Sequence, residues 1–248
     1  MEVCLVKLII VKDYNEASEV AFQHMVSVVK NNSHAVLGLA TGSTPSGLYQ
    51  RMVADHVLNR TSYKNVKTFN LDEYFGLSPE HEQSYFYFMN KHLFRGHDID
   101  EKNTHIPCGV GDIQKNCDDY NKMLEENPID IQLLGLGGNG HIGFNEPFTP
   151  FDSVTHYVEL KQRTREDNAR LFFNGNLDEV PTHAITMGIS NIMAAKKVLL
   201  IACGENKADA VKALVEGEPT EEIPASAIKN HPNCVVIIDE AAASKLEK

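Results

Sequence analysis

The sequence lacks paired cysteines, and this absence bears on where the protein works. Its five cysteines are odd in number, and no two of them form a C-x-x-C pair. Disulfide frameworks and zinc sites need such spacings, so free thiols in a reducing compartment are the simplest interpretation. We therefore expect a cytoplasmic protein without a structural metal, in which three cysteines in or beside apolar strands act as small core residues.

Basic residues are also scarce. The chain has 23 Lys and Arg against 34 Asp and Glu, so its formal net charge is −11, and no basic cluster overrides this balance locally. The charge argues against nucleic acids and anionic membranes as partners. An anionic small molecule would have to be held by a few chosen cations.

Long hydrophobic runs are absent as well. The apolar run at residues 8–11 is too short for the hydrophobic core of a signal peptide, so we interpret it as part of a strand. No linker, internal repeat or low-complexity segment interrupts the 248 residues. These features predict a single domain over residues 1–248 with a substantial core.

Apolar strands alternate with helical patterns along the chain. This order predicts an α/β fold with a doubly wound, mostly parallel sheet and helices on both faces. We expect helices after the first two strands and at residues 84–94, 117–126 and 163–173, and another through Leu214. The expected strands are residues 3–11, 35–39, 66–71, 129–136, 184–187, 197–203 and 234–238.

The central strand opens into a glycine-rich loop, LLGLGGNGHIGFNEP at residues 133–147. Its glycines satisfy G-x-G-x-x-G, but no helical period follows the third glycine, so we discount a dinucleotide site. A glycine-rich turn lets backbone approach a small ligand and leaves room for one ionisable side chain. His141 has the right position and a pKa suited to proton transfer near neutrality. The alternative is a loop histidine with only structural hydrogen bonds.

A second loop follows the strand at residues 35–39. Its sequence, ATGSTP, suits a helix start with Thr44 as the N-cap and Pro45 at the first helical position. Free backbone N–H groups and the helix dipole would make this an anion site, with phosphate as the natural ligand. An ordinary capped helix is the alternative. The sequence argues against a Walker A nucleotide site, because Leu48 and Tyr49 stand where Lys and Ser or Thr should be.

Two carboxylates, Asp72 and Glu73, follow the third strand, where the loops of a parallel sheet carry chemistry. One of them could supply a general base. Taken alone, they are equally expected to cap a neighbouring segment or to pair with a lysine.

Taken together, four features resemble one known family in order and spacing over nearly the whole chain. They are LATGSTPSGLY (residues 39–49), NLDEYFGL (70–77), GLGGNGHIGFNEP (135–147) and the Arg170 and Lys207 regions. The combination is similar to the glucosamine-6-phosphate deaminase (glucosamine/galactosamine-6-phosphate isomerase) family. The resemblance implies a modified Rossmann-like fold and conversion of D-glucosamine 6-phosphate and water to D-fructose 6-phosphate and ammonia, in amino-sugar catabolism. Proton transfers suffice for this reaction, so no cofactor and no metal is expected.

The resemblance also assigns the proton-transfer residues. Asp72 would be the base for the proton on C2 of the sugar. His141 would handle the proton of ring opening, with Asn139 and Glu146 as its partners. A carboxylate near a histidine orients the ring and stabilises its charged form, which agrees with this division.

The same resemblance assigns the phosphate ligands. Gly42, Ser43 and Thr44 would hold the phosphate through backbone and hydroxyl groups. Arg170 and Lys207 would neutralise it, the first in fork geometry and the second as a point charge.

The chain departs from the family pattern at several positions. Many members have aspartate where Asn139 stands, and an amide can orient His141 but cannot share its charge. Phe148 stands where glycine is usual, and the segment after Arg170 differs in length. Members activated by a second sugar phosphate have basic residues where this chain has His156 and Val158, so we expect no such activation. We expect a monomer or a small homo-oligomer.

Two other functions compete with the deaminase. A 6-phosphogluconolactonase would share the phosphate loop, but lactone hydrolysis needs no base aimed at C2, which Asp72 would supply. A non-catalytic sugar-phosphate sensor in a transcription regulator would need a helix-turn-helix and a basic face. The chain begins at its first strand and is acidic, so we favour the enzyme.

Overall fold

A seven-stranded parallel sheet organises the computed structural model, which describes residues 6–247. Its strands are β1 (Lys7–Val11), β2 (Val36–Leu39), β3 (Lys67–Asn70), β5 (Thr104–His105), β6 (Ile131–Gly135), β9 (Val198–Ala202) and β10 (Cys234–Asp239). They lie in the order β1-β10-β9-β6-β2-β3-β5, and every neighbouring pair is parallel. The predicted mostly parallel, doubly wound sheet is confirmed.

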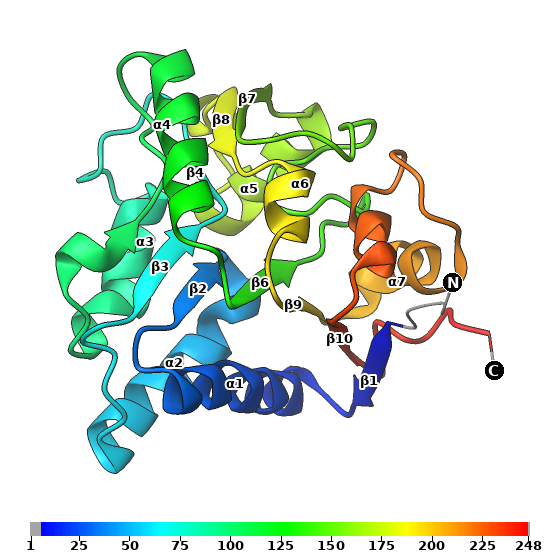
Figure 1. Cartoon of the computed structure of the whole chain (residues 1–248). Helices are drawn as coiled ribbons and strands as arrows, with labels where there is room; N and C mark the ends of the chain where they lie inside the picture. Colours follow the sequence, from blue (N-terminus) through cyan, green and yellow to red (C-terminus); the bar gives the residue numbers. More distant parts are fainter. Residues whose placement is uncertain (1–5, 248) are drawn as a thin grey trace.

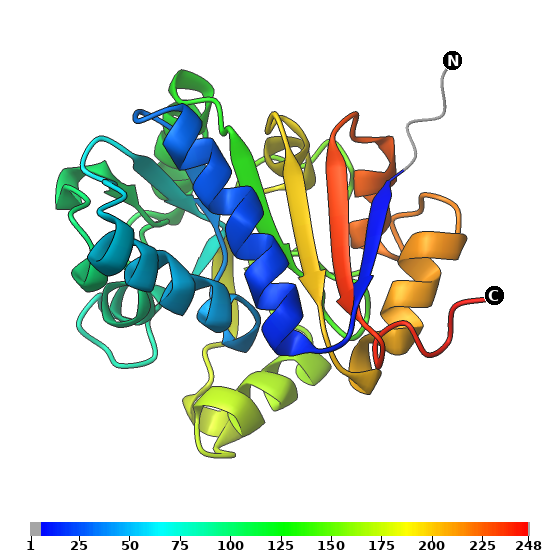
Figure 2. The ribbon, with the colours of Figure 1, turned by 90° about the horizontal axis from the view of Figure 1, so that it is seen from below.

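Helices cover both faces of this sheet. The α-helices are α1 (Tyr14–Asn31), α2 (Ser43–Asn59), α3 (Tyr85–His92), α4 (Ile113–Glu126), α5 (Gln162–Phe172), α6 (Ile189–Met193) and α7 (Ala208–Glu216). Short 3₁₀ helices occupy Phe94–Gly96, Glu101–Asn103, Leu177–Glu179, Glu205–Lys207 and Pro224–Asn230. Figure 1 shows α1 and α2 along one face, with α4 and α6 on the other. In Figure 2, α5 lies beyond the end of the sheet toward which the strand arrows point.

Burial explains why the central strands read as continuous apolar runs. Every residue of β9 and β10 is buried, since helices shield both faces of a parallel sheet. The edge strand β1 is less covered, and its Ile10 is exposed. No helix within residues 6–247 is both long enough and apolar enough to cross a membrane.

Several sequence signals at the chain ends have clear outcomes. Asp13 caps α1, and its carboxylate accepts the backbone N–H of Glu16. The predicted first strand begins at Lys7 and not at residue 3. Val6 lies before the strand, and residues 3–5, with Cys4, lie outside the described range. The four described cysteines are free thiols. Residues 241–246 form turns, and Ala242 packs into the core.

A second, antiparallel sheet was not distinguished by the sequence pattern. It consists of β4 (Asp72–Tyr74), β8 (His183–Thr186) and β7 (His156–Glu159), in the order β4-β8-β7. The predicted strand at residues 184–187 therefore belongs to this small sheet and not to the parallel one. Because β4 begins two residues after β3 ends, the chain changes sheets at Asp72, which pairs with Thr186.

The chain reverses its direction of travel across the sheet between β2 and β6. From β2 it proceeds to β3 and β5 on one side, and it then returns to β6 on the other side of β2. Such a switch point opens a crevice at the carboxyl ends of the two strands, which is where ligands bind in open α/β sheets. The two loops singled out in the sequence follow these two strands.

A partly buried histidine that does not line this crevice makes folding sensitive to acid. The His97 ring stacks on Tyr63, with centroids 4.5 Å apart, and its Nδ1 is buried with no hydrogen-bond partner among the described residues. Burial, aided by nearby His56, lowers the pKa of His97 from 6.5 to about 4. As the pH falls below about 6.5, the His97 ring therefore binds a proton in the unfolded chain before it does so in the folded chain.

We predict that His97 costs the folded state about 2 kcal/mol between pH 7 and pH 5. His97→Phe keeps an aromatic ring against Tyr63 but cannot be protonated. Urea unfolding at the two pH values should show a smaller acid-induced loss of stability for this variant than for the wild type. Equal losses in both proteins would contradict the assignment.

Candidate active site

One cleft at the switch point brings together most of the predicted site. Its lining includes seven of the nine predicted residues, namely Gly42, Ser43, Thr44, Asp72, His141, Arg170 and Lys207. The other two, Asn139 and Glu146, are absent from the lining and interact with His141. Residues separated by up to 165 positions in the sequence therefore meet at one site.

The N-terminus of α2 forms one end of the cleft. The predicted helix start is wrong by two residues, because Gly42 is the N-cap and Ser43 is the first helical residue. Gly42 has φ +95°, a conformation that glycine adopts easily and threonine does not. No side chain of the described residues caps this end, so the N–H groups of Ser43 and Thr44 are available to an anion, whereas Pro45 has no N–H group.

Two cations converge on the same region. Lys207 is half-buried, and its ammonium group makes no hydrogen bond or ion pair with another residue of the described range. Burial lowers the pKa of Lys207, which is expected of an ammonium group without a counter-ion. Arg170 is exposed and bonds to Asp167 at 2.8 Å. Both side chains line the cleft with the start of α2, which is the composition of a phosphate site.

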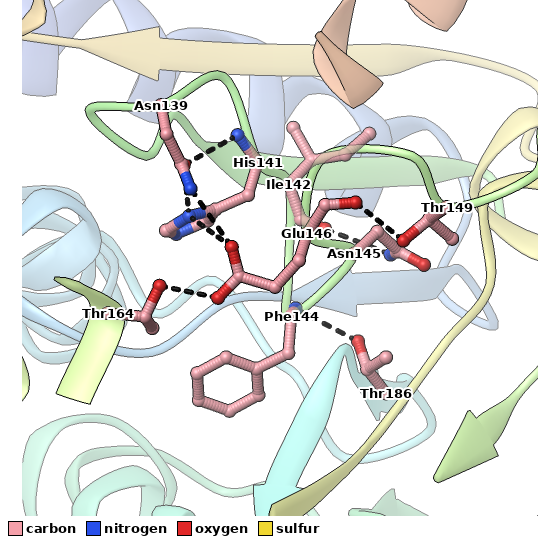
Figure 3. A network of polar contacts seen from close by, with 9 residues as sticks. All are labelled: Asn139, His141, Ile142, Phe144, Asn145, Glu146, Thr149, Thr164 and Thr186. Atoms are coloured by element: carbon pink, nitrogen blue, oxygen red, sulfur yellow. Dashed lines mark hydrogen bonds and ion pairs between the residues drawn. The ribbon is translucent and has the colours of Figure 1, made fainter. Parts of the chain in front are cut away.

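His141 belongs to a chain of hydrogen bonds that passes through Asn139 and Glu146 to Thr164 (Figure 3). Its ring Nδ1 lies 2.7 Å from Oδ1 of Asn139. The Nδ2 of Asn139 donates to Oε2 of Glu146 at 2.9 Å, and Oε1 of Glu146 accepts the hydroxyl of Thr164. The carboxylate lies 3.8 Å from the ring nitrogen, so the amide stands between histidine and glutamate.

This arrangement selects one tautomer of His141. Glu146 accepts from the amide nitrogen of Asn139, so the amide oxygen must face the ring. The same oxygen accepts the backbone N–H of His141 at 3.3 Å. An amide oxygen can only accept, so Nδ1 carries the proton and Nε2 keeps a free lone pair. The neutral ring can therefore take a proton at Nε2.

The surroundings keep His141 neutral. Burial is the main cause that lowers its pKa below 6.5, and the positive charges of Lys207 and Arg163 act in the same direction. The carboxylates of Glu146 and Asp167 oppose this shift. A histidine that stays unprotonated near neutral pH is available as a general base.

Gly137 makes room for the His141 ring. A Cβ at this position would lie 2.3 Å from ring atoms of His141, closer than real Cβ contacts come. The Gly137 N–H also donates to the His141 carbonyl at 2.9 Å. The glycine-rich turn thus lets the imidazole lie directly on the backbone.

We predict that Gly137→Ala lowers kcat by about 10- to 100-fold, because a displacement of roughly 1 Å at a catalytic group has an effect of this size. Gly135→Ala is the matched control, since a Cβ there would meet only Thr44 at an ordinary 3.9 Å. Steady-state kinetics of both variants test the prediction. Equal losses of kcat in the two variants would mean that an added side chain disturbs the loop in general, and that the position of the His141 ring is not the cause.

The structure gives the two adjacent carboxylates different roles. Glu73 accepts the N–H groups of Tyr74, Tyr85 and Phe86, so it caps the start of α3. The carboxylate of Asp72 forms no hydrogen bond or ion pair within residues 6–247, and it lines the cleft. Burial, then the charge of Glu73, raises the pKa of Asp72 to about 8. Only Asp72 is free to act as a base.

Buried polar contacts hold the loop that carries His141 and Glu146. The Asn145 amide donates to the carbonyls of Ile142 and Met187. Phe148 has φ +75° and is 69% exposed, while its N–H donates to Glu221. This left-handed conformation suits glycine better than phenylalanine, which accounts for the glycine expected at this position.

Apart from Arg170, the residues that α5 contributes to the cleft were not predicted from the sequence. One face of this helix lines the cleft with Thr164, Asp167, Asn168 and Leu171, which follow the i, i+3, i+4, i+7 pattern. Arg165, on the same helix, bonds to the carbonyls of Leu177 and Val180 and is structural. The sequence signal that could have revealed this face is the helical spacing of its polar residues. The same spacing is typical of a solvated helix face.

These features are typical of an enzyme that binds a small phosphorylated molecule and moves protons on it with a carboxylate and a histidine. The family model described as Glucosamine-6-phosphate isomerases/6-phosphogluconolactonase matches residues 14–237, and the chain belongs to this family. A glucosamine-6-phosphate deaminase of Lactobacillus delbrueckii subsp. bulgaricus is 52% identical over 97% of this chain and 100% of its own length. One of Clostridium perfringens is 46% identical over 97% and 100%.

Solved structures agree with this membership. A structure described as a monomeric glucosamine-6-phosphate deaminase is 43% identical, with a TM-score of 0.93 over 96% of this chain and 99% of its own. A 6-phosphogluconolactonase from Trypanosoma cruzi has a TM-score of 0.80 over 99% and 98% of the two chains. At 20% identity, the second likeness concerns the fold alone.

Proposed function

We propose that this chain is a glucosamine-6-phosphate deaminase, which converts D-glucosamine 6-phosphate and water to D-fructose 6-phosphate and ammonia. The observation that carries the proposal is the unpaired Asp72 in the same cleft as His141 and the free start of α2. The deaminase names of full-length relatives that are 46 to 52% identical support it.

The residues divide the reaction between them. Phosphate binds to the N–H groups of Ser43 and Thr44 and to the Arg170 and Lys207 side chains. The free Nε2 of His141 takes the proton of the C1 hydroxyl and returns it to the ring oxygen, so the sugar ring opens. Asn139 and Glu146 orient the imidazole throughout.

Asp72 then carries out the isomerisation. It removes the proton from C2, and the C–H electron pair forms the C1=C2 double bond of an enolamine. The π pair of the C1 aldehyde moves to its oxygen, which takes a proton from solvent and becomes the C1 hydroxyl. Return of the proton to C1 leaves a C=N bond at C2. Water hydrolyses this bond, which releases ammonia and leaves the C2 ketone. A base with a pKa near 8 is well matched to such a transfer.

The proposed enzyme acts in the cytoplasm as a monomer or small homo-oligomer. Four free thiols fit a reducing compartment, and a 43% identical relative is described as monomeric.

The decisive experiment measures ammonia and fructose 6-phosphate together after glucosamine 6-phosphate is added to the purified chain. Equal amounts of both products are expected. Hydrolysis of 6-phosphogluconolactone without ammonia release would overturn the proposal and favour the lactonase. Binding of the sugar phosphate without either product would favour a sensor.

A further inference from the structure

Thr164 makes a buried contact that the proposed reaction leaves without a role. It lies in the first turn of α5 and is 4% exposed, while Glu146 is 3% exposed. The Thr164 hydroxyl donates to Oε1 of Glu146 (Figure 3). Because the other carboxylate oxygen accepts from Asn139, each oxygen of Glu146 has one neutral donor that fixes its direction.

The orientation of Glu146 decides the orientation of the Asn139 amide. If the carboxylate turned away, the amide could flip and present its NH₂ group to Nδ1 of His141. Two donors cannot face each other, so His141 would then keep its proton on Nε2. That tautomer has no lone pair with which to accept a proton from a sugar hydroxyl.

The position of Thr164 on α5 connects this chain to the rest of the site. Six residues later the same helix carries Arg170, one of the proposed phosphate ligands, into the cleft. Between them, the Asn168 amide donates to the Tyr74 hydroxyl at 2.8 Å, which ties α5 to the strand that carries Asp72. Thr164 is the member of α5 that bonds directly to the His141 chain.

We propose that Thr164 is a positioning residue: its hydroxyl holds Glu146, and through Asn139 it keeps His141 in the tautomer that accepts a proton at Nε2. The first turn of α5 is thereby aligned with the proton-transfer chain, while its last turn meets the phosphate. This inference rests on the proposed function for its effect on turnover. The predicted tautomer of His141 does not depend on the proposed function, because the tautomer is a property of the protein without substrate.

The kinetic test compares Thr164→Val, which keeps the side-chain shape without the hydroxyl, with Thr164→Ser, which keeps the hydroxyl. We expect Thr164→Val to lower kcat by about 10-fold or more, since hydrogen bonds to charged groups have effects of this size. KM should change less than about twofold, because the phosphate ligands remain. Thr164→Ser should restore most of kcat. Wild-type kcat in Thr164→Val, or a Ser variant as slow as the Val variant, would overturn the inference.

The second test needs no turnover. Long-range ¹H–¹⁵N NMR spectra of the histidine rings report the tautomer, and the signals lost in His141→Gln identify His141. The wild type should show the Nδ1–H form, and Thr164→Val should show a mixture or the Nε2–H form. An unchanged tautomer overturns the inference. If Thr164→Val does not fold, Thr164→Ala replaces it.

The two proposals fail in different ways. A wild-type protein that releases no ammonia contradicts the deaminase, and the NMR comparison then still decides the role of Thr164. A wild-type protein that releases ammonia, with an unchanged tautomer in the Val variant, contradicts only the role of Thr164.

Discussion

Asp72→Asn is expected to lower kcat for ammonia release by about 10³-fold, within the range that a general base contributes. The asparagine side chain has nearly the same shape but cannot take the proton from C2. The wild-type carboxylate forms no hydrogen bond or ion pair within residues 6–247, so the substitution removes the base without breaking such a contact. Binding of the substrate phosphate, at the other end of the cleft, should be largely unaffected.

The same substitution should also change stability, with a definite dependence on pH. In the folded protein the pKa of Asp72 is about 8, whereas an unfolded chain has an aspartate pKa near 3.9. Between these values the folded state holds a proton that the unfolded state releases. Asp72 therefore destabilises the fold increasingly as the pH rises from about 4 to 8, by up to about 1.4 kcal/mol for each pH unit.

Thermal unfolding of both proteins between pH 5 and 8 tests this argument. The Tm of Asp72→Asn relative to the wild type should increase with pH, because asparagine does not titrate. A Tm difference that stays constant or shrinks as the pH rises would mean that Asp72 is ionised in the folded protein at little cost in stability. Loss of activity alone would not reveal this.

Glu73→Gln is the matched control, since it alters the neighbouring carboxylate. Glu73 accepts three backbone N–H groups at the start of α3, so its amide variant should weaken α3. It should leave kcat far closer to the wild type than Asp72→Asn does. A loss of kcat as large as that of Asp72→Asn would reverse the roles given to the two residues.

The contrast between Asp72 and Glu73 shows which features of the fold and the site can be predicted from the sequence and which cannot. Apolar runs predict the strands well, because both faces of a parallel sheet are buried and the signal is local. Which of two adjacent carboxylates faces the cleft depends on the strand pairing of Asp72 with Thr186, more than a hundred residues away. No local pattern contains that information.

Two other differences have similar causes. The Thr44 and Pro45 signal is typical of a helix start, but the chain leaves β2 with Gly42 in a left-handed conformation and enters the helix earlier. The polar face of α5 resembles a solvated surface, and only the folded chain brings Thr164 to a buried glutamate. The position of His141 in the cleft was predictable because a glycine-rich turn after a strand lets the backbone approach a small ligand and leaves room for one ionisable side chain.

Lys207→Met is expected to raise KM for glucosamine 6-phosphate by about 10- to 100-fold, since charged hydrogen bonds are worth about 1.5–3 kcal/mol. Methionine preserves most of the side-chain length while removing the charge. Lys207 is half-buried, and burial already lowers its pKa, so its ammonium group is poorly hydrated and available to a phosphate. The effect on kcat should be smaller, because the lysine contacts no reacting carbon in the proposed reaction.

The role of the charge is best tested by comparing two substrates. If Lys207 binds phosphate, kcat/KM for glucosamine 6-phosphate should fall, while any slow reaction of unphosphorylated glucosamine should not. Lys212→Met is the control, since Lys212 is an exposed lysine paired with Glu216 and Glu247. Equal losses for both sugars would move Lys207 from phosphate binding to proton transfer. In that case its influence on the pKa of His141 would become the main reason for its position in the cleft.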